Sequence, residues 1–386
     1  MEIAILGVSA GKNYPALILE IIGRGKHNLS IISEKELPDY LDQRAFDGFV
    51  LSGSACVSVI SRLDALSPLA QQTGYVNVIV NNGGKLTGYN TLGYGVKKLL
   101  EENGIDLTGC QFVISGNDVM NETLIRTVRD LGGITAESSD EHCSVLINTS
   151  SADMQIDLAK MDLLDTVIDL KCPPLRSRLV YESQIRGLKA VGGLEVLINE
   201  CLSAYELITG EEITSSETEE CRKKLYRKIR NIVIIGMPTA GKTTISEMVR
   251  QRYGKTIVEM DDMIEQETGM SIADYFSAFG EEAFRDRESG ICLKLSAGTG
   301  AIISTGGGVI KRHENMVELA ANSLIIWLDR ELPLLQGSSS RPLSRDSEAL
   351  KKMFEERKEL YGKYSDMRIE NNMTLEDVMK VLEEIL

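Results

Sequence analysis

Short runs of apolar residues recur along the chain and alternate with longer stretches in which apolar positions are three or four residues apart. Short apolar runs between turn residues are typical of buried strands, and the wider spacing is typical of amphipathic helices. In the first 210 residues this pattern predicts strands at 2–7, 48–52, 76–80, 111–115, 144–148 and 166–170, and helices that include 91–103, 119–131 and 192–208. The alternation indicates an α/β fold with mostly parallel sheets.

The same alternation restarts after a polar stretch. Residues 211–229 have an acidic half followed by a basic half, which is typical of a linker or an exposed connecting helix. Beyond them, apolar runs predict strands at 231–235, 256–259, 301–304 and 324–328. A chain of 386 residues favours two domains, or three small ones. We therefore expect an α/β domain over 1–210, a linker over 211–229 and a second α/β domain over 230–386.

The composition narrows the range of partners. A formal net charge of -15 argues against nucleic acid, because phosphate backbones are bound by clustered Lys and Arg. No apolar run approaches the roughly 20 residues that cross a bilayer. The N-terminus also lacks the basic segment of a signal peptide, so we expect a cytoplasmic protein with no membrane partner. Seven scattered cysteines favour reduced thiols, and three distant histidines disfavour a zinc site.

A glycine-bounded segment carries the clearest chemical signal. Residues 236–243 match G-x-x-x-x-G-K-[ST] between an apolar run and a helical pattern. In such a loop backbone N–H groups cradle phosphates, Lys242 reaches the β and γ groups, and the Thr243 hydroxyl is a magnesium ligand. The alternative, a chance glycine turn, is disfavoured by this strand, loop and helix context. The segment predicts a nucleoside triphosphate with Mg²⁺, and the lack of an N-K-x-D pattern disfavours a GTPase.

Four further segments follow the phosphate loop in order. They are VEMDDMIEQETG (258–269), GEEAFRDRES (280–289), ISTGGGVI (303–310), and SRPLSRD (340–346) followed by ERKELYGKYSDMRIENN (356–372). Together the five motifs resemble shikimate kinase across essentially all of 230–386. The resemblance implies a P-loop kinase domain with a five-stranded parallel sheet flanked by helices. It also implies that ATP phosphorylates the 3-hydroxyl of shikimate, giving shikimate 3-phosphate and ADP in chorismate and aromatic amino acid biosynthesis.

The resemblance implies roles for individual substrate-binding residues. Arg285 and Arg357 match the two arginines that hold the shikimate carboxylate, a task suited to guanidinium forks. Asp261 matches the aspartate that hydrogen-bonds the accepting hydroxyl and takes its proton. Gly307, within the triple glycine 306–308, matches a glycine that contacts the substrate.

Further matches concern the nucleotide. Arg341 matches the lid arginine that closes over the transferring phosphate, and Arg368 resembles an arginine near the nucleotide. The implied catalytic residues are Asp261, Lys242 and Arg341. The implied ATP contacts are Thr239, Ala240, Gly241, Lys242, Thr243, Thr244, Arg341 and Arg368.

Each role has a plainer alternative. Asp261 alone fits a helix N-cap, and Arg357, four residues before a tyrosine, fits a solvated helix face. The assignments therefore depend on the motifs occurring together. Two positions depart from the family: Thr239 replaces a glycine and should raise the KM for nucleotide, and Glu259 replaces an aspartate that is an outer-sphere partner of magnesium. Neither change removes a charge or a donor, so we expect activity to survive.

Residues 1–210 resemble shikimate dehydrogenase more faintly. The matching segments are QTGYVNVIVNNGGKLTGYNTLGYG (72–95), SVLINTSS (144–151) and GLEVLINECLSAYELITG (193–210). The resemblance implies a dehydrogenase-like α/β domain, but the positions of the catalytic lysine and aspartate hold Cys56 and Leu92. A leucine cannot exchange protons, so we expect this domain to be catalytically inactive.

The binding positions of the dehydrogenase family are also altered. Lys12 and Tyr14 stand at positions of serines that grip the substrate, and Glu200 replaces a glutamine, whereas Asn77, Asn90 and Ser52 still match. The turn at 112–123 lacks G-x-G-x-x-G, and residues 133–143 are too few for a strand and a crossover helix. The Rossmann half is therefore degenerate, and NADP is not expected. A buried apolar role for Cys56 is favoured over that of a nucleophile.

Three functions remain in view. The first is a magnesium-dependent shikimate kinase whose N-terminal domain serves as a scaffold, a dimerisation surface for a homodimer or an effector sensor. The second is a bifunctional dehydrogenase and kinase. The third is a nucleotide-gated binding module without phosphoryl transfer. A kinase for another hydroxy acid is disfavoured by FRDRE and the triple glycine.

Overall fold

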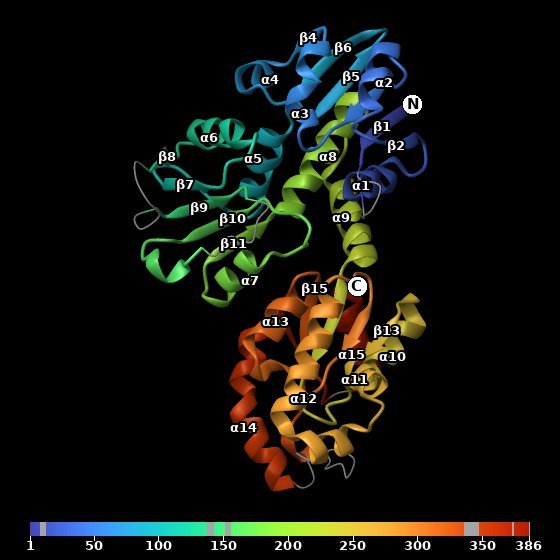
Figure 1. Cartoon of the computed structure of the whole chain (residues 1–386), viewed down its shortest axis with the longest axis vertical. Coiled ribbons are helices and arrows are strands. Elements are labelled where there is room, and N and C mark those ends of the chain that lie inside the picture. The colour runs from blue at the N-terminus through green and yellow to red at the C-terminus, as the bar shows by residue number, and fades with distance from the viewer. Residues whose placement is uncertain (8–12, 137–142, 151–155, 336–346, 373, 386) are drawn as a thin grey trace. The chain divides into compact units, whose positions relative to one another are not determined.

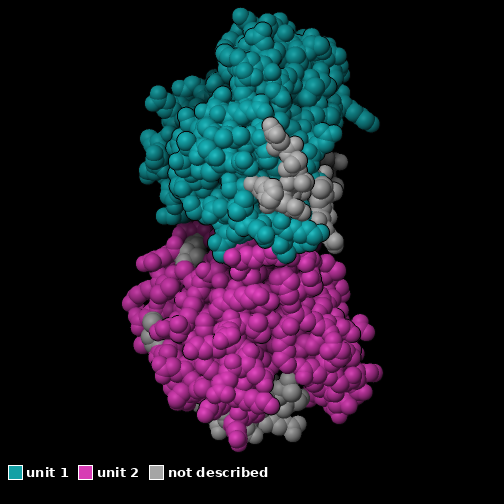
Figure 2. All heavy atoms as spheres, turned by 90° about the vertical axis from the view of Figure 1, so that its left-hand side faces the viewer, with its two compact units in different colours: residues 1–173, 187–225 teal, residues 174–186, 226–386 magenta. Residues whose placement is uncertain are grey.

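The structure, a computed structural model, describes residues 1–7, 13–136, 143–150, 156–335, 347–372 and 374–385. The chain divides into two compact units, shown in different colours in Figure 2. The first unit comprises residues 1–173 and 187–225, and the second comprises residues 174–186 and 226–386. This division differs from the expected boundaries because residues 174–186 group with the second unit. The stretch expected to be a linker or a connecting helix is mostly helix α9 (Ser215–Ile229).

The first unit contains two sheets (Figure 1). One has the order β2-β1-β3-β5-β6-β4, and β5 runs antiparallel to both β3 and β6. The β5–β6 hairpin turns at Gly83 and Gly84, where φ values of 59° and 93° favour glycine. These strands are β1 (Glu2–Leu6), β2 (Asn28–Ile32), β3 (Gly48–Val50), β4 (Ala65–Leu66), β5 (Val78–Asn82) and β6 (Lys85–Tyr89). The accompanying helices are α1 (Tyr14–Gly23), α2 (Leu37–Gln43), α3 (Ala55–Ser58) and α4 (Pro68–Thr73).

The second sheet of this unit is entirely parallel, with the order β11-β10-β9-β7-β8. Its strands are β7 (Gln111–Ser115), β8 (Ile134–Thr135), β9 (Val145–Asn148), β10 (Thr166–Asp169) and β11 (Lys189–Gly192). Helices α5 (Leu92–Glu102) and α8 (Gly193–Thr209) pack against each other, and α6 (Asn121–Asp130) follows β7. Strand β8 has only two residues.

The second unit has one parallel sheet with the order β13-β14-β12-β15-β16. Its strands are β12 (Asn231–Ile235), β13 (Ile257–Glu259), β14 (Ile302–Ser304), β15 (Ser323–Asp329) and β16 (Met367–Glu370). Its helices are α7 (Arg178–Ile185), α10 (Lys242–Tyr253), α11 (Met260–Thr268), α12 (Ile272–Ser296), α13 (His313–Ala320), α14 (Ser347–Tyr364) and α15 (Leu375–Ile385). The expected five-stranded parallel sheet is confirmed.

The sequence of β12 explains how both faces of this sheet are covered. Successive side chains of a strand point to opposite faces. Ile232 and Ile234 pack in a cluster with residues of α10 and α15, whereas Val233 and Ile235 pack in a second cluster with residues of α11 to α14. Figure 1 shows α13 and α14 to one side of the sheet and α10 and α15 to the other. A continuous apolar run is therefore what a central strand requires here.

Within the described residues, no helix combines the length and apolar character needed to span a membrane. The same part of the chain brings no three His, Cys, Asp or Glu side chains together in a way suited to a metal ion. The seven cysteines lie within the described residues and form no disulfide there.

Candidate active site

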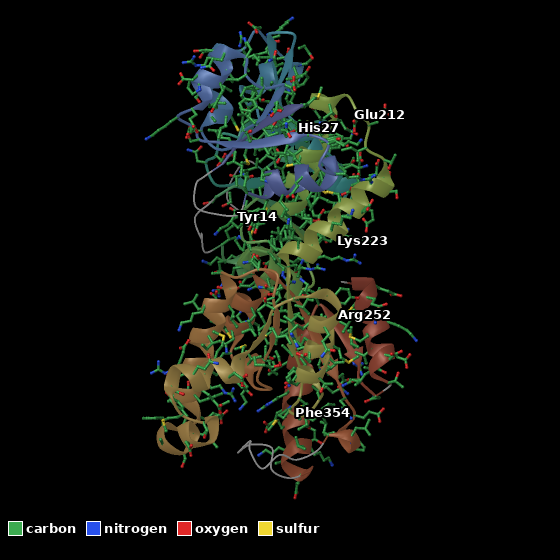
Figure 3. The ribbon with its side chains drawn as sticks, turned by 90° about the vertical axis from the view of Figure 1, so that its right-hand side faces the viewer. Tyr14, His27, Glu212, Lys223, Arg252 and Phe354 are labelled. Carbon is green, nitrogen blue, oxygen red and sulfur yellow. The ribbon has the colours of Figure 1, made fainter. Side chains whose placement is uncertain are left out.

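The phosphate loop connects the end of β12 to the start of α10, as the sequence predicts. Gly241 precedes the helix with φ 94°, and a Cβ at this position would lie 2.7 Å from Asn371 Nδ2. Lys242 is buried, and its Nζ donates hydrogen bonds to the carbonyl oxygens of Gly236 and Met237 at 3.1 and 2.9 Å. The ammonium group is thus held within the loop, where phosphate oxygens bind in loops of this type. Arg252 near the end of α10 and Phe354 on α14 are labelled in Figure 3.

Thr239 has an unusual backbone conformation within this loop. Its φ is 62°, in the left-handed region that a β-branched residue rarely adopts. The structure thus gives a physical reason why glycine suits this position. Ala240 is buried and its carbonyl accepts a hydrogen bond from Asn371 Nδ2 at 2.7 Å, whereas Thr243 and Thr244 are exposed on the first turn of α10.

A carboxylate adjoins Thr243. Glu259 ends β13 and hydrogen-bonds Ser304 and Thr243, and burial raises its pKa, with smaller contributions from Asp262 and Asp261. Its Oε1 is buried and has no hydrogen-bond partner among the described residues. An unpaired carboxylate oxygen next to a threonine hydroxyl is the donor chemistry that Mg²⁺ prefers. The residues present therefore fit a magnesium ion.

Asp261 lies in the first turn of α11, opposite the triple glycine that follows β14. The N-cap of this helix is Glu259, so the alternative assignment of Asp261 as the cap is wrong. A Cβ at Gly306 would lie 3.1 Å from Asp261 Oδ1 and 3.2 Å from Glu288 Oε1. The missing side chain at Gly306 therefore leaves room for two carboxylates beside the backbone.

Arg285 projects from α12 toward the same glycines and is buried, with an exposed fraction of 6%. Its guanidinium group donates to Glu288 Oε2 at 2.8 Å and to Glu281 Oε1 at 3.2 Å. A Cβ at Gly308 would approach Arg285 Nη2 within 2.4 Å, so glycine is required for this arrangement. Burial raises the pKa of Glu288, and the nearby Arg285 opposes this rise.

Arg357 reaches the triple glycine from α14. Its Nη1 donates to the Gly307 carbonyl oxygen at 2.8 Å, and the same oxygen accepts the Tyr361 hydroxyl at 2.5 Å. Arg357 is 4% exposed, so its alternative assignment to a solvated helix face is wrong. Its Nε is buried and has no partner within the described part of the chain. A Cβ at Gly307 would lie 2.9 Å from Pro238 Cδ, which places this glycine against the phosphate loop.

Of the remaining two arginines of the predicted site, the structure describes Arg368 but not Arg341. Arg341 lies outside the described residues. Arg368 on β16 is half exposed, forms an ion pair with Asp329 at 2.7 Å and stacks over Trp327. From this region, Asn371 donates a hydrogen bond to the Ala240 carbonyl of the phosphate loop. The side chain of Arg330 lies nearby, since its Nη1 would be 3.9 Å from a Cβ added at Gly241.

Sequence reasoning missed several residues that complete the site: Glu288, Tyr361, Arg330 and Asn371. Glu288 follows Arg285 by three residues and Tyr361 follows Arg357 by four, which places each pair on one helix face. That spacing was available in the sequence as a signal. The contact of Asn371 with Ala240 joins residues 131 positions apart and leaves no local pattern.

The positions in the first unit that match the dehydrogenase family form an internally bonded network. Asn77 Nδ2 donates to Thr91 Oγ1 and to Glu200 Oε1 at 2.9 and 2.8 Å, and Asn77 Oδ1 accepts from the Thr91 N–H. Asn90 Nδ2 similarly donates to the hydroxyls of Thr73 and Thr123. The side-chain amides of Asn77 and Asn90 are therefore bonded to other residues of the protein rather than directed to a ligand.

The groups that would react in this network are unsuited to catalysis. Leu92 is a core residue, and burial raises the pKa of Cys56 to about 12, so this thiol stays protonated near neutral pH. Burial also raises the pKa of Glu200 to about 7. Tyr14 is buried in the first turn of α1, and Lys12 lies outside the described residues.

Comparison with solved structures identifies the fold of the first unit. A shikimate 5-dehydrogenase from Thermus thermophilus, solved in complex with shikimate, matches 58% of this chain and 99% of its own, with a TM-score of 0.52 and 23% identity. A chorismate mutase/shikimate 5-dehydrogenase fusion protein from Clostridium acetobutylicum matches 58% of this chain and 96% of its own, with a TM-score of 0.52 and 18% identity. The dehydrogenase-like fold expected for the N-terminal part is confirmed.

Comparison with curated proteins concerns the remainder of the chain. The shikimate kinase family model matches residues 238–386. The shikimate kinase of Clostridium beijerinckii is 40% identical over 159 residues, which are 40% of this chain and 94% of that protein. The shikimate kinase of Symbiobacterium thermophilum is 34% identical over 40% of this chain and 95% of its own length. Since the match spans nearly the whole of each relative, this chain belongs to the shikimate kinase family.

Proposed function

We propose that the second unit transfers the γ-phosphoryl group of ATP to the 3-hydroxyl of shikimate, giving shikimate 3-phosphate and ADP for chorismate and aromatic amino acid synthesis. The observation that carries this proposal is the meeting of two buried guanidinium groups, from Arg285 and Arg357, at a glycine turn packed against the phosphate loop. The unpaired Arg357 Nε is available for a carboxylate oxygen.

Each side chain has a role in the proposed mechanism. The two arginines bind the substrate carboxylate and so orient the ring, and Asp261 accepts the hydroxyl proton. Lys242 leaves its carbonyl partners to contact the β- and γ-phosphates. Thr243, with Glu259 beside it, would hold Mg²⁺, which neutralises charge on the phosphates when bound. Arg341, from the segment outside the described residues, is proposed to cover the transferring phosphate, and Arg368 stays a proposed nucleotide contact.

A coupled assay of ADP release by the full chain tests this function. We expect ADP release that requires shikimate and Mg²⁺, with a phosphate ester as product by ³¹P NMR. ADP release that does not depend on shikimate would contradict the proposal. Asp261→Asn should lower kcat by about 10² or more while ATP affinity is kept. A nucleotide-gated binding module would instead show no transfer in the unsubstituted chain.

The dehydrogenase-like fold of the first unit favours a second candidate, a bifunctional dehydrogenase and kinase. We propose instead that this unit is catalytically inactive and takes no NADP, because Cys56 and Leu92 occupy the catalytic positions and Asn77 is bonded internally. Shikimate-dependent NADP reduction, measured by absorbance and lost in Asn77→Ala, would establish the second candidate. A homodimer formed through the first unit and a cytoplasmic location stay predictions.

A further inference from the structure

Residues 174–186 lie between strands β10 and β11 in sequence, yet they belong to the second unit. This segment, here called the docking segment, is outside residues 238–386 that the family model matches. It contains helix α7, which packs against α13. It is therefore an addition to the kinase fold contributed by a distant part of the chain.

Arg176 makes several polar contacts from the docking segment. Its Nη2 donates to Asp366 Oδ2 at 3.1 Å and to the Ser323 carbonyl oxygen at 3.1 Å, and its Nη1 also bonds Asp366. Its Nε donates to the Ala320 carbonyl oxygen at 3.2 Å. The side chains of Arg176 and Asp366 are 15% and 23% exposed. A bidentate pair of this kind fixes geometry as well as charge.

Tyr181 fixes the same region through packing. Its ring is 3% exposed, belongs to the core cluster of the second unit and lies under the Arg176 guanidinium group. Its hydroxyl donates to the Tyr364 carbonyl oxygen at 3.0 Å. Tyr364 is the last residue of α14, where carbonyl groups have no partner within the helix. The docking segment therefore supplies a partner for the end of α14.

Arg176 and Tyr181 meet at the turn between α14 and β16. Asp366 in this turn also accepts the Ile325 N–H at 2.7 Å, which joins the turn to the central sheet. Helix α14 carries Arg357 toward Gly307, and β16 leads to Asn371, which bonds the phosphate loop at Ala240. The position of this turn therefore fixes the end of α14, which carries Arg357, and the start of β16, which leads to Asn371.

We propose that the docking segment is a positioning element of the kinase site: by holding the α14–β16 turn, Arg176 and Tyr181 fix Arg357 and Asn371 in their working positions. Neither residue contacts substrate in this account. The proposal rests on the proposed kinase function for its kinetic readout. It assigns to the N-terminal half of the chain a specific physical means of influencing the kinase.

Kinetics of full-length variants test the proposal. Arg176→Ala should raise the KM for shikimate about tenfold, because a displacement of about 1 Å in an orienting group costs up to about 10²-fold. Tyr181→Phe, which removes one hydroxyl and keeps the ring, should raise it about threefold. Arg176→Lys should restore part of the loss, since it keeps the charge facing Asp366.

Arg178→Ala provides the matched control. Arg178 lies in the same segment and pairs with the half-buried carboxylate of Glu182 and the exposed carboxylate of Glu314 rather than with Asp366. The KM and kcat of Arg178→Ala should stay within about twofold of the values for the unsubstituted chain. Thermal unfolding of every variant identifies any that fails to fold. If Arg176→Ala does not fold, the KM of Tyr181→Phe for shikimate tests the proposal.

The affinity for a non-hydrolysable ATP analogue, measured by titration, is the second readout. If the unsubstituted chain transfers no phosphate to shikimate, the proposed function fails, and weaker analogue binding in Arg176→Ala than in Arg178→Ala still supports the positioning role. Folded Arg176→Ala and Tyr181→Phe variants with unchanged KM and analogue affinity would overturn it.

Discussion

At the scale of single residues, two positions hold a group in a state that costs free energy: one is a strained backbone conformation and the other is a buried carboxyl group. Thr239 adopts φ 62° in the phosphate loop, where a residue with a Cβ is disfavoured by about 1–2 kcal/mol. Glu200 is a buried carboxyl whose pKa is raised by desolvation. Both positions carry a residue that differs from the family they resemble, and each difference has a measurable consequence.

Thr239→Gly should lower the KM for ATP by about threefold, because glycine adopts the left-handed conformation freely and removes a side chain that crowds the loop. Steady-state kinetics at saturating shikimate measure this. Arg24→Gly is the control, since Arg24 also has a positive φ of 50° but lies in the first unit. An unchanged or higher KM in Thr239→Gly would refute the strain argument.

Glu200→Gln should stabilise the protein at pH 8 and leave it nearly unchanged at pH 5. The pKa of Glu200 is raised to about 7 in the folded state, so the folded chain retains a proton that the unfolded chain releases at lower pH. Stability therefore falls as pH rises from about 4.5 to about 7, and the glutamine variant avoids this loss, which is about 3 kcal/mol. Urea unfolding at both pH values measures the effect. An equal effect of the substitution at both pH values would contradict this expectation.

The family motifs implied roles for Lys242, Asp261, Arg285 and Arg357 because each motif fixes a residue type at its position, and these roles stay predictions. Glu288 and Tyr361 were missed because their roles consist of holding another group rather than matching a motif. For Arg368 the sequence could not indicate that Asp329 and Trp327 would engage the guanidinium group.

At the scale of elements, the triple glycine after β14 acts as a meeting point for α11, α12, α14 and the phosphate loop. Each of its three residues faces a different neighbour: Gly306 faces Asp261 and Glu288, Gly307 faces Pro238, and Gly308 faces Arg285. The absence of side chains here matters most at Gly308, where a Cβ would displace the Arg285 guanidinium group.

Gly308→Ala should raise the KM for shikimate about tenfold or more with little change in the KM for ATP. The new methyl group would meet the end of the flexible Arg285 side chain, which can move without unfolding the protein but then loses its position. Steady-state kinetics and thermal unfolding measure the two effects. Gly290→Ala is the control, because this exposed glycine of α12 has open space around it. Equal kinetics in both variants would contradict the assignment.

Apolar runs predicted the strands that form the centres of the three sheets, because burial on both faces imposes a continuous apolar pattern. Short edge strands such as β4 and β8 were not predicted, since two residues carry no pattern. The antiparallel course of β5 was missed as well, because strand direction depends on the Gly83–Gly84 turn rather than on hydrophobicity.

At the scale of the whole molecule, the two units are not two consecutive segments of chain. Residues 174–186 belong to the second unit although they lie within the first in sequence. The sequence does not indicate this arrangement, because the apolar face of α7 does not specify which of the two cores it packs against. Removing the first 225 residues therefore also removes Tyr181 from the core of the second unit.

An isolated fragment 226–386 should unfold at a lower temperature than the second unit of the full chain. Loss of a buried aromatic ring costs about 3 kcal/mol or more, and the exposed surface should bind a hydrophobic dye. Adding a synthetic peptide of residues 173–187 should restore the midpoint. The same peptide with Arg176→Ala and Tyr181→Ala should not. A fragment that is fully stable and unaffected by either peptide would contradict this expectation.

The central claim is that Arg285 and Arg357 hold the carboxylate of shikimate beside the phosphate loop. The most direct measurement compares kcat/KM for shikimate and for its methyl ester in the full chain and in Arg357→Met. We expect the unsubstituted chain to prefer shikimate by about 100-fold, since hydrogen bonds to charged groups contribute about 1.5–3 kcal/mol each. The variant should lose most of this preference. An identical preference in both proteins would contradict this claim.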